Sequence, residues 1–114
     1  MGKYNNKKVV YDNHVFDSAA EYLRYCELCL LERAGIIADL RVHPRYEIIP
    51  GFKHNGKKHR PTYYAPDFVY VEGGRTIAED IKGMATQVYR IKSKLFMLKY
   101  PHIEFREIPA SEVV

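Results

Sequence analysis

The chain has 114 residues, a length typical of one domain, and we expect residues 1–114 to fold as a single unit. Apolar residues make up 46% of the chain, which is ordinary for a protein with a hydrophobic core. No apolar run approaches the ~18 residues that cross a bilayer, and the basic start lacks the apolar segment of a signal peptide. These features exclude a membrane protein and favour a soluble, cytoplasmic one.

Positive side chains outnumber negative ones, and the formal net charge of +4 is compatible with a polyanionic partner. The positive charges gather in an N-terminal arm, a central segment and a later helical stretch: Lys7 and Lys8; Lys53, Lys57, Lys58 and Arg60; Arg90, Lys92, Lys94 and Lys99. The two cysteines, Cys26 and Cys29, stand in a helical stretch without a second pair, so we interpret them as core residues rather than zinc ligands.

The first elements are a short hairpin and a helix. Residues 9–11 and 14–16 are extended runs on either side of Asp12 and Asn13, which are turn residues. Ser18 and Glu21 form the S-x-x-E pattern of a capping box and predict a helix start, and Gly35 predicts its end. Apolar side chains at helical spacing predict the buried stripe of this helix: Ala19, Leu23, Cys26, Leu30 and Ala34.

Residues 40–52 alternate in an extended pattern that leads to a second hairpin. Asn55 and Gly56 are the preferred pair for a two-residue type I′ turn, which sets Lys53 against Lys58. The same register sets Pro50 against Pro61. Because proline cannot donate to a strand ladder, we expect the tip beyond these prolines to separate from the main sheet.

A third hairpin brings two aspartates together. Residues 63–71 and 76–82 are extended runs joined at Gly73 and Gly74, which supply the positive φ of a two-residue turn. This register places Asp67 directly opposite Asp80, with their Cβ atoms roughly 4.5–5.5 Å apart. The two-residue period of a strand puts Lys82 on the same face and Glu79 on the other, where we expect a solvated charge.

The last two elements are a helix and a strand. The helix begins near Thr86, its predicted core stripe is Val88, Ile91, Leu95 and Leu98, and Pro101 ends it. Residues 103–108 alternate like a strand. The element order is therefore hairpin, α, β, β, β, α, β, which predicts an α/β (α+β) fold with a mixed central sheet flanked by helices.

The paired aspartates predict a metal site. Two like charges facing each other destabilise a sheet unless a cation shares them. Carboxylate oxygens of Asp67 and Asp80, with the main-chain carbonyl of Ile81, suit Mg²⁺ or Mn²⁺, and such an ion acidifies water and neutralises charge on phosphorus. The ammonium group of Lys82 is placed to orient the attacking water. The histidines show neither H-x-x-x-H nor H-N-H spacing, which argues against a ββα-metal nuclease.

The ordered series S-x-x-E, P-D and D-x-K resembles the PD-(D/E)xK nuclease superfamily. More narrowly, the chain resembles a phage-encoded family of small proteins long catalogued as a domain of unknown function. The resemblance covers roughly residues 3–107. It is carried by residues 3–8, 16–18 with Glu21, 31–35, 65–68, 79–83 and 94–96.

This resemblance implies a restriction-endonuclease-like αβββαβ core and metal-dependent cleavage of DNA, often branched DNA such as a Holliday junction. The implied active site is Glu21, Asp67, Asp80 and Lys82. Many members have Glu at the position of Asp80, so the number of metal ions stays open. Junction-resolving relatives act as dimers, which implies a homodimer, and a phage protein would act in the host cytoplasm.

Each residue also has a simpler interpretation. Glu21 serves as a helix cap, as a metal ligand or as both, and Asp67 as a ligand or as a surface aspartate paired with Lys82. The basic tip binds phosphates or merely keeps the hairpin in solution, and Gln87 and Lys94 either line the cleft or are solvated. Two rival functions are a non-catalytic nucleic-acid-binding module and an assembly protein with a stabilising ion.

Overall fold

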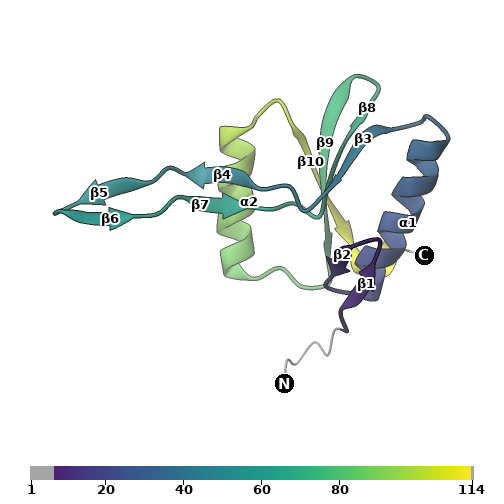
Figure 1. Cartoon of the computed structure of the whole chain (residues 1–114), viewed down its shortest axis with the longest axis horizontal. Helices are drawn as coiled ribbons and strands as arrows, with labels where there is room; N and C mark the ends of the chain where they lie inside the picture. Colours follow the sequence, from purple (N-terminus) through teal and green to yellow (C-terminus); the bar gives the residue numbers. More distant parts are fainter. Residues whose placement is uncertain (1–6, 114) are drawn as a thin grey trace.

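Local turn and cap chemistry sets most of the element boundaries in the computed structural model, which describes residues 7–113 (Figure 1). The elements in chain order are β1 (Val9–Tyr11), β2 (His14–Phe16), α1 (Ala19–Arg33), β3 (Ala38–Val42), β4 (Tyr46–Ile49), β5 (Phe52–His54), β6 (Lys57–His59), β7 (Thr62–Tyr64), β8 (Phe68–Glu72), β9 (Arg75–Lys82), α2 (Gln87–Lys99), β10 (Glu104–Pro109) and the 3-10 turn η1 (Ala110–Glu112). The two predicted helices, the strands between them and the last strand are present in the predicted order. The extended runs predicted over residues 40–52 and 63–71 are, however, broken into separate strands: β3, β4 and β5 in the first, and β7 and β8 in the second. Among the described residues there is no helix long and apolar enough to cross a membrane.

The central sheet has four strands in the order β10-β9-β8-β3, with β9 and β10 parallel and the other pairs antiparallel. It is the mixed sheet that the sequence predicts. Helix α1 and the β1–β2 hairpin lie on one side of it and α2 on the other (Figure 1). Each side has its own core: Phe16, Tyr25, Leu28, Ile37, Phe68, Tyr70, Ile77 and Ile81 toward α1, and Ile48, Tyr64, Val69, Ala78, Phe96 and Ile103 toward α2.

The hairpin β8–β9 has the register that its glycine turn predicts. Gly73 and Gly74 have φ of 58° and 77°, a region that costs glycine little. The ladder pairs Glu72 with Arg75 and ends with Phe68 opposite Glu79. Asp67 is the residue just before this ladder and Asp80 the one just beyond it, so the expected juxtaposition of the two aspartates is confirmed at the level of the backbone.

The tip hairpin separates from the main sheet as predicted. Strands β5 and β6 form a two-stranded sheet of their own, with Lys53 opposite Lys58, and Asn55 and Gly56 have φ of 50° and 78°. Strands β4 and β7 form a second two-stranded sheet, which connects this tip to the body. Figure 1 shows the two sheets as one long arm, residues 46–64, that projects from the body beside α2.

The buried face of α1 differs from the predicted stripe. The side chains of Leu23 and Leu30 are 41% and 60% exposed, whereas Glu21, Tyr25 and Leu28 are buried. The physical reason is that the polar groups of the inward face have partners in the fold. The Tyr25 hydroxyl donates to Asp12 at 2.6 Å, and Glu21 is held by hydrogen bonds to neighbouring groups. Matched polar groups and a large aromatic ring therefore outweigh a regular row of leucines.

The predicted core stripe of α2 is wrong at three of its four positions, and only Leu95 packs against the core. Val88, Ile91 and Leu98 are 63%, 61% and 78% exposed, and Ser93 and Phe96 are the buried residues of this helix. Phe96 packs among the rings of Tyr46, Tyr64, Tyr100 and Phe105. An aromatic side chain buries more area than an aliphatic one, and this cluster fixes the rotation of α2 against the sheet.

Candidate metal centre

Asp67 and Asp80 hold each other in place through the backbone of the opposite strand. The amide N–H of Asp67 donates to Oδ1 of Asp80 at 3.0 Å, and the N–H of Ile81 donates to Oδ2 of Asp67 at 2.8 Å. Both residues are buried, with exposed fractions of 8% and 2%. In each carboxylate, therefore, one oxygen accepts a hydrogen bond from the hairpin backbone and the other is available to a further partner.

The remaining oxygens are in a poorly solvated place. Oδ2 of Asp80 is buried and has no hydrogen-bond partner among the described residues. Burial raises the pKa of Asp67 to about 7, with a further rise from Glu21, and burial likewise raises the pKa of Asp80 to about 7. Lys82 opposes both shifts. A buried acidic oxygen without a partner is a costly group that a cation would satisfy.

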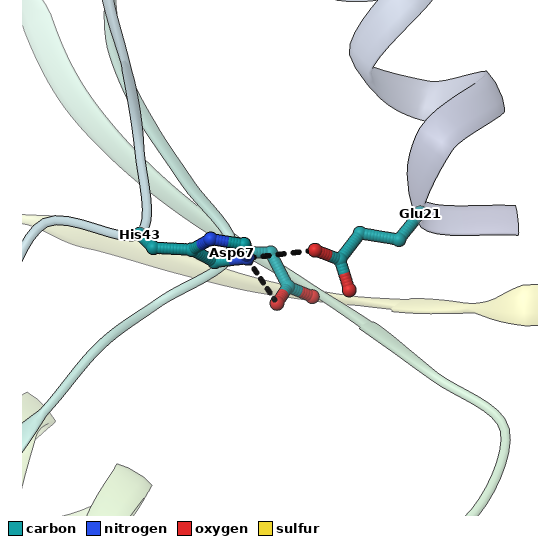
Figure 2. A group of neighbouring side chains, drawn as sticks. All are labelled: Glu21, His43 and Asp67. Carbon is teal, nitrogen blue, oxygen red and sulfur yellow. Dashed lines mark hydrogen bonds and ion pairs between the residues drawn. The ribbon is translucent and has the colours of Figure 1, made fainter. Parts of the chain in front are cut away.

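Glu21 combines the two roles that the sequence leaves open. Its own N–H donates to Oγ of the N-cap Ser18 at 3.2 Å, and its Oε2 accepts a hydrogen bond from the Asp17 N–H at 3.4 Å. The capping box is thus present, with Asp17 rather than Ser18 as the backbone donor. The other oxygen, Oε1, points away from the helix toward Asp67 and His43 (Figure 2).

His43 is the residue that the sequence analysis missed. Its Nε2 lies 2.7 Å from Oε1 of Glu21 and 3.9 Å from Oδ1 of Asp67 (Figure 2). The backbone N–H of His43 donates to the main-chain oxygen of Asp67 at 3.0 Å, and the backbone of His43 has a φ of 53°. That φ is uncommon for a residue with a side chain. The hydrogen bond to Glu21 raises the pKa of His43 above its ordinary value.

One atom each from Glu21, His43 and Asp67 lie within 4.8 Å of one another, a spacing that fits a shared metal ion. Carboxylate oxygen and imidazole nitrogen are both good ligands for divalent first-row metals. Asp80 is not in this group of three. It is hydrogen-bonded to the backbone of Asp67, and its Oδ2 has no partner among the described residues. The donor set of two carboxylates and an imidazole fits a divalent cation.

Lys82 lies at the edge of the centre and is steadied from α2. Its Nζ is 4.1 Å from the ring centre of Tyr89, a cation–π contact. The Tyr89 hydroxyl donates to Glu107 at 2.7 Å, which fixes the ring. A cleft of about 630 Å³ opens here, and its lining includes Asp17, Ser18, Glu21, Asp67, Ile81, Lys82, Gly83 and Thr86. Three of the four predicted active-site residues, Glu21, Asp67 and Lys82, line this cleft. The fourth, Asp80, is not in the lining but accepts a hydrogen bond from the backbone of Asp67.

Glu79 is not the solvated charge that the strand period suggests. It lies on the α1 side of the sheet, opposite to Asp80 as expected, but its exposed fraction is 0%. The guanidinium of Arg24 donates to its two oxygens at 2.9 and 2.6 Å, and the Tyr70 hydroxyl donates to one of them. Arg24 comes one helical turn after Glu21, so the ion pair fixes α1 against β9.

The predicted nucleic-acid contacts lie outside the cleft. Lys53, Lys57, Lys58 and Arg60 are exposed on the arm, and Lys7 and Lys8 are exposed just before β1. Gln87 and Lys94 are exposed on α2, and Gln87 follows Thr86, which lines the cleft. The structure therefore brings Glu21, Asp67, Asp80 and Lys82 together and leaves the basic side chains spread over three exposed surfaces.

Comparison with known proteins gives one family. A family model described as "Protein of unknown function (DUF1064)" matches residues 1–112. No curated protein matches the chain.

Proposed function

Because the chain belongs to the DUF1064 family of proteins of unknown function, its activity has to be inferred from its own side chains, and we propose that it is a metal-dependent DNA endonuclease of the PD-(D/E)xK type. The observation that carries the proposal is the buried pair Asp67 and Asp80, each with a pKa raised to about 7, beside a cleft edged by Lys82. Carboxyl groups with pKa values shifted by burial cluster at functional sites, which supports this proposal.

The residues that would hold Mg²⁺ or Mn²⁺ are Asp67, Asp80, Glu21 and the main-chain carbonyl of Ile81. When bound, the ion would acidify a water molecule and neutralise charge on the phosphate. His43 would hold Glu21 in position through its 2.7 Å contact, or would itself supply a nitrogen ligand. Oδ2 of Asp80 supports the presence of a cation, because no described protein group donates a hydrogen bond to this buried oxygen.

Lys82 would act on the nucleophile rather than on the metal. Its ammonium group is half-buried at the cleft and held over the Tyr89 ring, so it has a defined position with donors to spare. From there it would orient the attacking water by donating a hydrogen bond and would stabilise negative charge on the phosphate. The Tyr89–Glu107 hydrogen bond would support this role by keeping the ring in place.

DNA would be held by its phosphates over a wide surface. The exposed side chains available for this are the cations Lys53, Lys57, Lys58 and Arg60 on the arm, Lys7 and Lys8 at the N-terminal end and Lys94 on α2, with the neutral amide of Gln87 beside them. Phosphate contacts position a protein without reading sequence, which favours selection by DNA structure. The resemblance to junction-resolving enzymes extends the proposal to branched DNA and to a homodimer, which sedimentation in solution would test.

The decisive experiment is cleavage of labelled four-way junction, flap, linear duplex and single strand with Mg²⁺, Mn²⁺ or EDTA. We expect metal-dependent cutting that falls by roughly 100-fold or more in Asp67→Asn and Lys82→Ala. Asp67→Asn keeps an oxygen that accepts the Ile81 N–H, so the hairpin is preserved. Asp39→Asn, an exposed carboxylate outside the cleft, is the matched control. Cutting in EDTA, or full activity in Asp67→Asn, overturns the proposal.

A second candidate is a non-catalytic nucleic-acid-binding module. The observation that favours it is His43, because its Nε2 lies 2.7 Å from Glu21 and 3.9 Å from Asp67 and so gives both carboxylates a partner from the protein itself. This module would bind DNA in a salt-sensitive way and would be unaffected by Asp80→Ala. The nuclease would instead lose cleavage in Asp80→Ala while its DNA binding persists or tightens.

A further inference from the structure

The tip of the arm has two chemically different faces. Successive residues of a strand point to opposite faces, so the pair Lys53 and Lys58 is on one face. The stacked pair Phe52 and His59 is on the other, together with the pair His54 and Lys57. The rings of Phe52 and His59 are stacked, with centroids 4.7 Å apart and planes at 11°. Phe52 is 51% exposed, so one side of this stack remains open to solvent.

Neither face is what a free hairpin would favour. Two lysines directly opposite each other repel, and an exposed phenyl ring keeps apolar surface in water. A stacked cross-strand pair stabilises a hairpin by only about 0.2–1 kcal/mol, which is small beside the cost of leaving a phenyl ring exposed to water. Both faces suit a single kind of ligand, one that carries negative charges and flat rings side by side. A nucleotide strand has that chemistry.

The hollow beside the stack is large enough for such a ligand. Its volume is about 690 Å³, and it is lined by Gly51, Phe52, Lys53, Lys58, His59, Arg60 and Pro61. A Cβ atom at Gly51 would lie 3.2 Å from the main-chain oxygen of His59 and 3.3 Å from Cδ of Pro61. A side chain at position 51 would therefore crowd the far strand next to the hollow.

We infer that the tip of the arm binds an unpaired nucleobase, which stacks on Phe52. Lys57, on the same face as Phe52, holds a neighbouring phosphate, and so do Lys53, Lys58 and Arg60, which line the same hollow as Phe52. The inference rests on the proposed function and names its substrate class: DNA with unpaired bases, such as a bubble, a flap or an opened branch point. Bases inside a continuous duplex have both faces covered by their neighbours. An aromatic side chain reaches a base face only where the stack is interrupted.

The test is binding of the wild-type chain in EDTA to two fluorescent DNAs, so that no cleavage occurs. One is a duplex with a short central bubble that contains 2-aminopurine, and the other is the fully paired duplex of the same length. We expect quenching of 2-aminopurine by the bound protein in the bubble only. Phe52→Ala should abolish that quenching and weaken bubble binding roughly 5- to 150-fold, with duplex binding changed less than twofold.

Two further variants separate stacking from a structural role. Phe52→Tyr keeps an aromatic face and should retain bubble binding, whereas Phe52→Leu keeps an apolar cross-strand contact and should not. Full bubble affinity in Phe52→Leu, or an equal loss on bubble and duplex, overturns the inference; the second result would indicate a ribbon lying in a groove of paired DNA. The binding test contains no metal and so does not depend on cleavage. If the protein stacks bases in this test but never cuts DNA with metal present, the proposed nuclease activity fails and the inferred base-binding surface stands.

Discussion

At the scale of single residues, the ionisation of the buried aspartates makes the stability of the fold depend on pH. Burial raises the pKa of Asp67 and Asp80 to about 7 from an ordinary value of 3.8. Between these two pH values the folded chain binds more protons than the unfolded chain, so the free energy of unfolding falls as pH rises. His43, whose pKa is also raised, loses its proton above its ordinary value and acts in the same direction.

We therefore predict that the metal-free protein becomes less stable as pH rises from about 4 through about 7. Urea unfolding in EDTA at a series of pH values measures this as a falling midpoint. The slope should flatten in Asp80→Asn, which removes one titrating group, and Mg²⁺ should raise the midpoint most above pH 7. A midpoint that is level across this range would contradict the raised pKa values.

The buried ion pair between Arg24 and Glu79 gives a second prediction. Glu79→Ala would leave the Arg24 guanidinium and the Tyr70 hydroxyl without their partner in a water-poor place, and we expect a loss of about 3–5 kcal/mol in the free energy of unfolding. Glu27→Ala is the matched control, because Glu27 also bonds Arg24, at 3.4 Å, but its side chain is 44% exposed. That change should cost less than about 0.5 kcal/mol.

At the scale of elements, turns and caps were predictable from sequence and helix rotation was not. Asn55–Gly56, Gly73–Gly74 and the Ser18 cap are local signals, because the residues that make the structure are neighbours in the chain. The inward face of each helix is decided by distant partners. Arg24 meets Glu79 across 55 positions of sequence, and no pattern within α1 shows this.

The same limit explains why His43 escaped the sequence analysis. Its contacts with Glu21 and Asp67 form only when the loop after β3 packs against the start of α1, and it stands in no metal-binding motif. The aspartate pair, by contrast, followed from counting residues away from a glycine turn. Its register was therefore open to prediction, and its environment of histidine and buried backbone was not.

The observed rotation of α2 predicts unequal roles for its apolar residues. Phe96→Ala should lower the free energy of unfolding by about 3–5 kcal/mol, because it opens a cavity in the aromatic cluster. Ile91→Ala, at a position that is 61% exposed, should change it by less than about 0.5 kcal/mol. Chemical denaturation of the two variants measures the difference. A large loss in Ile91→Ala would instead support the stripe expected from sequence or a partner bound there.

At the scale of the whole molecule, the body holds the acidic centre and the arm carries much of the exposed positive charge. Because log K for DNA falls with log salt by about 0.9 per neutralised phosphate, the arm's share of binding can be measured separately. We predict that changing Lys53, Lys57, Lys58 and Arg60 together to Gln lowers the salt slope by about 2–4. Lys7→Gln with Lys8→Gln removes two charges and should lower the slope by at most about 1.8, which is the comparison. An unchanged slope in the four-residue variant would show that the arm does not touch DNA.

The tight glycine turn also determines which insertions the centre tolerates. One extra residue after Gly74 would shift β9 by a single step and rotate every later side chain to the reverse side of the sheet. Asp80 would then face α1, and Glu79 would move to the position across from Asp67. Two extra residues would restore the parity and merely displace the acids along the strand. The length of this loop modulo two is therefore as much a part of the centre as the carboxylates themselves.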